Sequence, residues 1–345
     1  MIAPLIPQGR PLLLLAPMQD VTDLSFWRVL HRYGGPDVYF TEYFRVHSAS
    51  TPESWILDAI RNNPSGRPVI AQMIGQDIEH LVRTAALLQK ENIAALDLNI
   101  GCPAPIVCRK SSGGGMLRNL AHLDKVIAAL RPAIHVNFTL KTRIGFDSPE
   151  EFDALLDLYA QHPIDALTVH GRTVKEMYRV NVHYDRIAQA VQKMKCPVFA
   201  NGNILSAGNA RAVVEQTGAQ GLMIGRGAIR NPWIFNQIRE SHAGEIKTRP
   251  TLSDVREYVE ILYRGTRPEG FSETLQVARM KKFMNFIAQK IDPEDQFLHQ
   301  IRRAASEMDF FKICDQFLCG DALFNPETPE KALANAGNPR TDCYL

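Results

Sequence analysis

The residues with the clearest capacity for chemistry lie in the sequence DLNIGCP, at positions 97–103. Cys102 follows an apolar run typical of a buried strand. A cysteine on a loop just past a strand end can reach a ligand, whereas a cysteine inside the strand would pack in the core. A second thiol, Cys108, and the basic pair Arg109-Lys110 follow it. Taken alone, the stretch fits a tight turn with an incidental thiol equally well, so the ends of the other strands decide between the two interpretations.

Polar and charged side chains recur at the ends of other strand-like segments. The segments are 12–18, 38–44, 69–75, 95–101, 138–145, 166–172, 198–204 and 221–227. Their ends carry Ala16-Pro17-Met18, Thr41-Glu42, Gln72, Asn99 with Cys102, Lys141 and Arg143, His170 with Arg172, Asn201 and Asn203, and Gly225-Arg226-Gly227. Strands that only pack in a core do not need this row of groups. The strand ends therefore predict one shared ligand site.

The last of these strand ends has the chemistry of a phosphate site. Gly225 and Arg226 can present backbone N–H groups and a guanidinium to a phosphate. Gly202 lets the preceding loop approach the same phosphate.

The elements that position these residues alternate along the chain. Helical spacing appears at 77–92, 119–131, 149–161, 184–195 and 206–217, between the apolar segments. Short apolar strands separated by amphipathic helices predict a parallel sheet covered by helices. Eight strands in this length favour a closed (β/α)8 TIM barrel, in which the chemistry lies at the carboxyl ends of the strands. An open doubly wound sheet remains the alternative.

The pattern changes near Pro250. Thr251-Leu252-Ser253-Asp254 has the pattern of a helix start, and helical patterns continue through 263, over 273–289 and over 293–319, with no further strands. We therefore predict a catalytic barrel over 1–246, a smaller all-helical domain over 247–320 and a loop-rich tail over 321–345.

Composition narrows the class of protein. The 345 residues are 45% hydrophobic and 22% charged, which is typical of a soluble globular protein. A formal net charge of +2 neither announces nor excludes nucleic-acid binding. The six cysteines fit neither a disulfide framework nor a zinc site. The apolar run 12–18 is too short to span a membrane. We expect a reduced, cytoplasmic protein that is monomeric and holds no metal.

The strand-end motifs together point to one family. They are APMQDVTD at 16–23, TEY at 41–43, QMIG at 72–75, DLNIGCP at 97–103, KTRIG at 141–145, VHGRT at 169–173, ANGNI at 200–204 and MIGRGA at 223–228. In this order they resemble the motifs of the flavin-dependent tRNA-dihydrouridine synthases over residues 12–240, and that family carries a helical RNA-binding domain after its barrel. The chain departs from the family at Asn203, where members usually have an acidic residue, although an amide can still hydrogen-bond a hydroxyl.

The resemblance implies FMN in the barrel mouth, NADPH as its reductant and a uridine in tRNA as the substrate. Hydride adds to carbon 6 of the uracil ring, and a proton donor must then lie over carbon 5. A thiol with an ordinary pKa of about 8.5 is protonated near neutral pH and can serve as that acid. The family assigns this role to the cysteine that corresponds to Cys102, while Cys108 is the rival thiol without a matching motif position.

The resemblance also assigns residues to the cofactor and to the base. The cofactor set is Pro17, Met18, Gln72, Lys141, His170, Asn201, Gly202, Asn203, Gly225 and Arg226. The charge of Lys141 suits the pyrimidine edge of a reduced flavin, and the amide of Gln72 suits its imide edge. Substrate contacts are expected from Asn99, Arg143, Arg172 and Tyr178.

A stacked uridine has to be turned out of the RNA, which requires an extended RNA-contacting surface. Arg279, Lys281 and Lys282 of the helical domain are candidates for it, although acidic residues are interleaved and a solvated helix face would look similar. Two other functions remain open. One is a flavin enzyme acting on a free pyrimidine, such as a dihydroorotate or dihydropyrimidine dehydrogenase, and the other is a non-catalytic RNA-binding protein.

Overall fold

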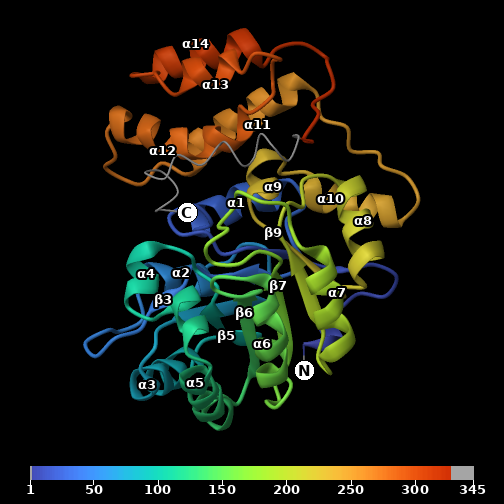
Figure 1. The fold of residues 1–345 in the computed structure, drawn as a ribbon. Helices are drawn as coiled ribbons and strands as arrows, with labels where there is room; N and C mark the ends of the chain where they lie inside the picture. Colours follow the sequence, from blue (N-terminus) through green and yellow to red (C-terminus); the bar gives the residue numbers. More distant parts are fainter. Residues whose placement is uncertain (1, 328–345) are drawn as a thin grey trace.

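The computed structural model describes residues 2–327, in which parallel strands form a barrel with helices outside it (Figure 1). The strands are β1 (Leu12–Leu15), β2 (Tyr39–Phe40), β3 (Phe44–Arg45), β4 (Val69–Ile74), β5 (Ala95–Ile100), β6 (Asn137–Arg143), β7 (Ala166–His170), β8 (Val198–Asn201) and β9 (Gly221–Ile224). All eight predicted strand segments are present, and the second is divided into β2 and β3. The backbone N–H of Leu15 donates to the carbonyl of Val38 over 3.1 Å beside a parallel bridge from Leu14 to Val38. These contacts join the two ends of the strand order β1-β9-β8-β7-β6-β5-β4-β2 and confirm the barrel.

The helices between the strands agree with the predicted alternation. They are α1 (Leu24–Arg32), α2 (Ser54–Arg61), α3 (Ile78–Leu88), α4 (Pro105–Arg109), α5 (Leu120–Ala133), α6 (Phe152–Tyr159), α7 (Tyr184–Lys193), α8 (Ala207–Thr217), α9 (Arg226–Arg230) and α10 (Ile234–His242). Short 3₁₀ turns lie at η1 (Ala3–Leu5), η2 (Gly113–Arg118) and η3 (Pro149–Glu151). Side chains of Asp77, Asn119 and Ser206 accept the first free backbone N–H groups of α3, α5 and α8. These caps explain where the three helices begin.

Strand alternation produces two apolar cores. On β1, Leu12 and Leu14 point into the barrel interior, whereas Leu13 and Leu15 pack against the surrounding helices. This division follows from the period of two along a strand. The interior core also contains Ile2, so the N-terminal segment packs against the inner layer of the barrel.

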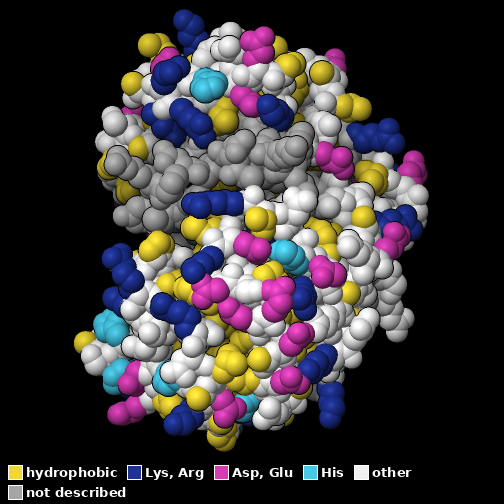
Figure 2. All heavy atoms as spheres, viewed as in Figure 1, with side chains coloured by type: hydrophobic (Ala, Val, Ile, Leu, Met, Phe, Trp, Pro, Cys, Tyr) yellow, Lys and Arg dark blue, Asp and Glu magenta, His cyan; other side chains and the backbone are white. Residues whose placement is uncertain are grey.

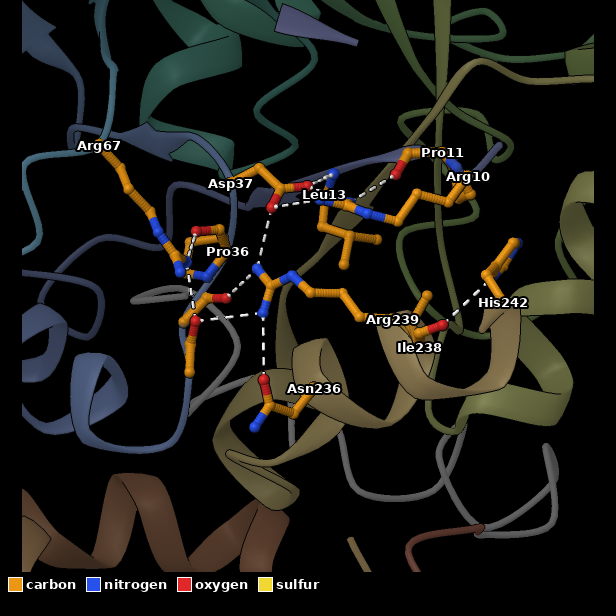
Figure 3. A network of polar contacts seen from close by, with 12 residues as sticks. Arg10, Pro11, Leu13, Pro36, Asp37, Arg67, Asn236, Ile238, Arg239 and His242 are labelled. Carbon is orange, nitrogen blue, oxygen red and sulfur yellow. Dashed lines mark hydrogen bonds and ion pairs between the residues drawn. The ribbon is translucent and has the colours of Figure 1, made fainter. Parts of the chain in front are cut away.

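An ion-pair network ties the start of β1 to α10 on the face opposite the strand ends that carry the motifs (Figure 3). The carboxylate of Asp37 accepts from Arg10 over 2.6 Å, from Arg239 over 2.9 Å and from the backbone N–H of Leu13 over 3.0 Å. Burial by itself raises the pKa of Asp37, but the hydrogen bond from Arg10 and the charge of Arg239 outweigh it and lower that pKa. The network therefore stabilises the closed barrel at its amino-terminal face.

The C-terminal region is helical, as predicted. Its helices are α11 (Leu252–Gly265), α12 (Glu273–Ile287), α13 (Gln296–Ile301) and α14 (Glu307–Phe317). Thr251 begins α11 with a capping box to Asp254, which confirms the predicted helix start. The pattern predicted over 293–319 is divided into α13 and α14, because Ser306 caps a new helix there by accepting from the backbone N–H of Asp309. The predicted tail lies outside the described residues from position 328 onward.

The helical region packs directly on the barrel. The guanidinium of Arg230, 2% exposed, donates to the backbone carbonyls of Phe286, Ile287 and Gln289 at the end of α12. The ring of Phe26 on α1 stacks on that of Phe283 on α12, with centroids 5.8 Å apart. Helix α12 is thereby held over the carboxyl ends of the strands. Within the described part of the chain, no helix has both the length and the apolar character needed to cross a membrane.

Candidate active site

A cavity of about 630 Å³ opens at the carboxyl ends of the strands, with α12 forming part of its wall. The predicted site residues that line it are Pro17, Met18, Asn99, Cys102, Lys141, Arg143, His170, Tyr178, Asn201, Gly202, Asn203, Gly225, Arg226 and Lys282. Four predicted residues do not line it: Gln72, Arg172, Arg279 and Lys281. The structure therefore brings most of the strand-end residues into one cavity, whose size is ordinary for a small-molecule site.

The loop carrying Cys102 is fixed by its neighbours. The side-chain oxygen of Asn99 accepts from the backbone N–H groups of Gly101 and Cys102, over 3.1 and 3.0 Å. The Nε of Arg143 donates to the carbonyl of Gly101 over 3.0 Å. Asn99 and Arg143, both predicted to hold a substrate base, thus also hold the backbone that presents the thiol.

The two rival thiols occupy different environments. Cys102 lines the cavity, whereas Cys108 is buried beneath it and directs its Sγ at the carbonyl of Cys102 over 3.4 Å. Burial raises the pKa of the Cys102 thiol, and a backbone hydrogen bond from Ala104 and the charges of Arg143 and Lys141 only partly oppose that effect. Cys102 is consequently protonated at neutral pH.

A buried chain of side chains lies beneath the cavity. The amide of Gln72, fully buried, donates to Asp97 over 2.8 Å and accepts from Asn99 over 2.8 Å. Burial raises the pKa of Asp97 to about 6, although hydrogen bonds from Thr139 and Gln72 oppose the shift. Both polar atoms of Gln72 are therefore engaged within the protein.

Lys141 lies beside these groups at the end of β6. Burial, followed by repulsion from Arg143, lowers its pKa from 10.5 to about 8, while the charges of Asp97 and Cys102 act in the opposite direction. Lys141 remains mostly cationic at pH 7 in a poorly solvated position. Such a charge interacts strongly with a polarisable ligand, because little water screens it.

His170 is neutral in this site. Burial and the charges of Arg143, Arg172, Lys141 and Arg226 lower its pKa well below the usual value. The Nη1 of Arg172 lies 3.3 Å from its Nε2, and because a guanidinium can only donate, Nε2 accepts and the ring proton is on Nδ1. Arg172 also donates from Nε to the carbonyl of Val180 over 2.6 Å. Its position is behind His170, and not at the cavity surface.

The loops after β8 and β9 form one concave surface. The Nη2 of Arg226 donates to Oδ1 of Asn203 over 3.2 Å, so the two loops are joined at the positions predicted for a phosphate. Gly202 has a φ of +127°, and a Cβ there would lie 2.9 Å from a methyl group of Val182. A Cβ on Gly227 would collide with the carbonyl of Ile204. Glycine at 227 therefore allows the loops after β8 and β9 to approach closely, and glycine at 202 allows the loop after β8 to pack against Val182 in the segment that follows β7.

Tyr178 lies between two guanidinium groups. Its ring centroid is 4.6 Å from the Cζ of Arg226 and 5.3 Å from the Cζ of Arg143. The centroid of the His170 ring is 5.9 Å away. Tyr178 thus lies between Arg226 of the phosphate-site loop and Arg143, which holds the Cys102 loop. This position makes Tyr178 a stronger candidate for a substrate contact than the sequence indicated.

The cavity is strongly cationic in a nearly neutral protein. Seven Lys or Arg residues line it against one acidic residue, Asp20. Arg45, Lys110, Arg179 and Lys282 are the exposed members and come from four separate elements. In the view of Figure 2, by contrast, basic and acidic side chains are interspersed over the barrel. We call these four residues the cationic rim.

Sequence reasoning missed three members of the rim. Arg45, Lys110 and Arg179 lie at the mouth, and Lys110 had a visible signal in the basic pair after the Cys102 turn. It also missed Tyr43, which lines the cavity and whose hydroxyl acts to lower the pKa of Cys102 against the larger effect of burial. Tyr43 is the last residue of the TEY motif at 41–43, so the sequence did offer a signal for it.

Of the three predicted RNA contacts in the helical region, only Lys282 lies at the cavity. Arg279 forms an ion pair of 2.6 Å with Asp23, the residue that caps α1, and its side chain is 18% exposed. Its position is that of a connection between α12 and the barrel.

Comparisons with known proteins agree with the motifs. The family described as dihydrouridine synthase (Dus) matches residues 14–319. The chain is 36% identical over 246 residues to tRNA-dihydrouridine synthase B of Pseudomonas putida, covering 70% of this chain and 72% of that protein. It is 32% identical over 295 residues to tRNA-dihydrouridine synthase B of Yersinia pestis, covering 83% and 89%. Among solved structures, histamine dehydrogenase from Rhizobium sp. 4-9 has the same fold, with a TM-score of 0.51 at 13% identity over 73% of this chain and 48% of that one.

Proposed function

The chain belongs to the dihydrouridine synthase family, and on this premise we propose that it reduces uridine to 5,6-dihydrouridine in tRNA with FMN as cofactor and NADPH as electron donor. The observation that carries the proposal is the placement of one protonated thiol, Cys102, in a cationic cavity that also contains a phosphate-type cradle. A polyanionic substrate is favoured by the cationic rim, because a small free pyrimidine would not need four exposed cations from separate elements.

The residues of the cavity fit FMN. Gly225 and Arg226, joined to Asn203, offer N–H groups and a guanidinium to a terminal phosphate. Met18 lies close enough that a Cβ on Gly225 would be 3.2 Å from its sulfur, so an apolar wall adjoins the cradle. Lys141 provides a positive charge for the polar edge of the ring, and His170 an Nδ1–H donor. When bound, the flavin supplies the hydride that adds to carbon 6 of the uracil.

Cys102 gives the proton in this proposal. Its Sγ–H bond breaks as a C–H bond forms at carbon 5, and the charge that accumulates on carbon 5 and oxygen 4 is neutralised. The raised pKa keeps the thiol protonated beforehand, while the nearby charges of Lys141 and Arg143 stabilise the thiolate afterwards. Asn99 and Arg143 keep the Cys102 loop in place while the proton moves.

RNA is held by the mouth together with the helical region over 247–320, which we propose as the RNA-binding part. Lys282 and Asn285 of α12 line the cavity, so a bound RNA backbone could follow α12 and still place its base beside Cys102. The five described cysteines are unpaired, which suits a reducing compartment such as the cytoplasm.

A matched pair of variants tests the proposal. Cys102→Ala should bind FMN and accept hydride from NADPH, yet form dihydrouridine about 10²–10⁴-fold more slowly, the usual contribution of a general acid. Cys108→Ala removes an equal thiol six positions away and should retain the wild-type rate. Dihydrouridine in tRNA is measured by mass spectrometry after single-turnover mixing with the NADPH-reduced enzyme. Loss of activity in the Cys108 variant alone would refute the assignment of the acid, and an absence of dihydrouridine with wild type would refute the function.

A further inference from the structure

Helix α4 projects an apolar side chain into the mouth of the cavity. Ile106 is 62% exposed. Seven large hydrophobic side chains are exposed among the described residues, and Ile106 is the one of them that lines the cavity. Isolated exposed apolar side chains are common on protein surfaces, but this one lies four positions from the thiol that gives the proton.

The base of α4 is fixed, although its tip is exposed. The buried Cys108 directs its Sγ at the carbonyl of Cys102, and the guanidinium of Arg118 donates to the carbonyl of Cys108 over 2.5 Å. The N–H of Gly114 donates to the carbonyl of Cys102 over 2.9 Å. A Cβ on Gly115 would lie 2.5 Å from the carbonyl oxygen of Cys108, so η2 packs tightly under the helix. Ile106 is therefore held at a set position relative to Cys102.

The surroundings of Ile106 have the chemistry of a nucleic-acid contact. Arg109 and Lys110 are exposed on the same short segment, and the Nε of Arg109 donates to the carbonyl of Pro105 over 3.3 Å. Arg179 contributes a further exposed cation to the cavity lining. An apolar tip beside cations matches a base stack beside phosphates, because apolar wedges enter between bases while Lys and Arg neutralise the backbone.

We propose that Ile106 enters the RNA at the position left by the target uridine and keeps the neighbouring bases from closing the gap, while Arg109 and Lys110 hold the adjacent phosphates. This inference rests on the proposed function. Turning a stacked nucleotide out of an RNA costs stacking free energy. A side chain that fills the vacated space recovers part of the lost contact. Ile106 would thus contribute to opening the substrate, and not to the chemistry on the uracil.

The test compares two RNAs that differ in whether the uridine must be unstacked. One is a folded tRNA with the target uridine in its native loop, and the other is a short unstructured oligonucleotide with the same flanking sequence. Ile106→Ala should lower kcat/KM on the folded tRNA by about tenfold or more, a typical effect of one lost base contact. On the oligonucleotide the same variant should lie within about twofold of wild type. Ile106→Leu, which keeps an apolar tip, should restore most of the activity on tRNA.

A fluorescence signal distinguishes insertion of Ile106 into the RNA, called the wedge below, from a general loss of enzyme activity. With 2-aminopurine placed next to the target uridine in the tRNA, wild type should raise its fluorescence on binding, and Ile106→Ala should raise it much less. Leu87→Ala truncates an exposed apolar side chain on α3, which lies outside both the cavity and the helical region, and it should match wild type in every measurement. The rate of flavin reduction by NADPH should not change in either variant.

The outcomes distinguish the wedge from the proposed function. Equal losses of Ile106→Ala on both RNAs would overturn the wedge and make Ile106 part of the wall around the reacting base. Unchanged activity and an unchanged fluorescence rise would also overturn it. In both of these cases the wild-type enzyme still forms dihydrouridine, so the proposed function survives. Absence of product with wild type on either RNA would overturn both.

Discussion

Lys141 should make the folded protein less stable than a variant without that charge. Burial lowers its pKa from 10.5 to about 8, so its cationic form is disfavoured in the folded state relative to the unfolded chain. The difference of about 2.5 pKa units corresponds to roughly 3 kcal/mol at pH 7. The attraction of Asp97 is already part of this net shift. Lys141→Met, which keeps an unbranched side chain only one atom shorter, should therefore raise the free energy of unfolding of the flavin-free protein by about 2–3 kcal/mol.

The pH dependence gives this prediction its sign. The folded-state pKa lies below the unfolded-state value, so the folded protein binds fewer protons between the two values. The destabilisation is complete below about pH 8 and disappears as the pH rises toward 10.5. The stability difference between Lys141→Met and wild type should thus be largest at pH 7 and shrink steadily above pH 8.

Urea unfolding of the flavin-free proteins at a series of pH values measures the difference. Lys282→Met is the matched control, because Lys282 lines the same cavity but is exposed. It should change stability by no more than about 0.5 kcal/mol at any pH. Lys141→Met should also bind FMN more weakly, since the charge is proposed to face the flavin. A Lys141→Met protein that is less stable than wild type at pH 7, or a difference that does not vary with pH, would refute the reasoning.

Three further expectations concern separate parts of the molecule. Arg226→Ala should lose FMN during purification while wild type releases FMN, and not FAD, on denaturation; release of FAD or full occupancy of the variant would contradict the phosphate assignment. Asp37→Ala should lower the free energy of unfolding in urea by about 3 kcal/mol, because it leaves Arg10 and Arg239 without their carboxylate. The folded-state pKa of Asp37 is depressed, so its contribution should be present above pH 4 and be lost as the pH falls through that lowered value; a loss independent of acid pH would count against it. Replacing Lys110 and Lys282 together by Gln should reduce the slope of log Kd for tRNA against log salt by about two, one for each lysine, and an unchanged slope would remove them from the phosphate contacts.

The barrel and the cavity could be predicted because their signals are local. Each strand is a short apolar run, and each run ends in a residue type that a core does not need, such as Lys141 or His170. Parallel strands place all such ends on one face, so the order of motifs along the chain is enough to assemble the site. The division of the second predicted strand into β2 and β3 could not be predicted. The residues between them, Thr41-Glu42-Tyr43, have the same sequence pattern whether the strand is continuous or interrupted.

The positions of Gln72 and Arg172 show where local signals stop. Both follow the strand-end pattern, yet Gln72 is engaged by Asp97 and Asn99, and Arg172 lies behind His170. A strand-end residue can face the cavity or the layer beneath it, and the choice depends on the side chains of the neighbouring strands. The sequence does not show which side chains of neighbouring strands meet until the register of the sheet is known.

The sequence also could not show which basic residues of α12 reach the cavity and which attach the helix to the barrel. Arg279 and Lys282 are three positions apart and so lie on one side of the helix. Arg279 meets Asp23, a residue 256 positions earlier in the chain, and forms a partly buried ion pair with it. Lys282 lies about one turn further along α12, at the mouth of the cavity. The same helix side therefore both attaches α12 to the loop that follows β1 and completes the wall of the site.

A charge reversal at Arg279 would weaken RNA binding through the docking of α12, whereas the same change at Lys282 would act at the mouth itself. The two effects are separable, because only the first should lower the stability of the RNA-free protein.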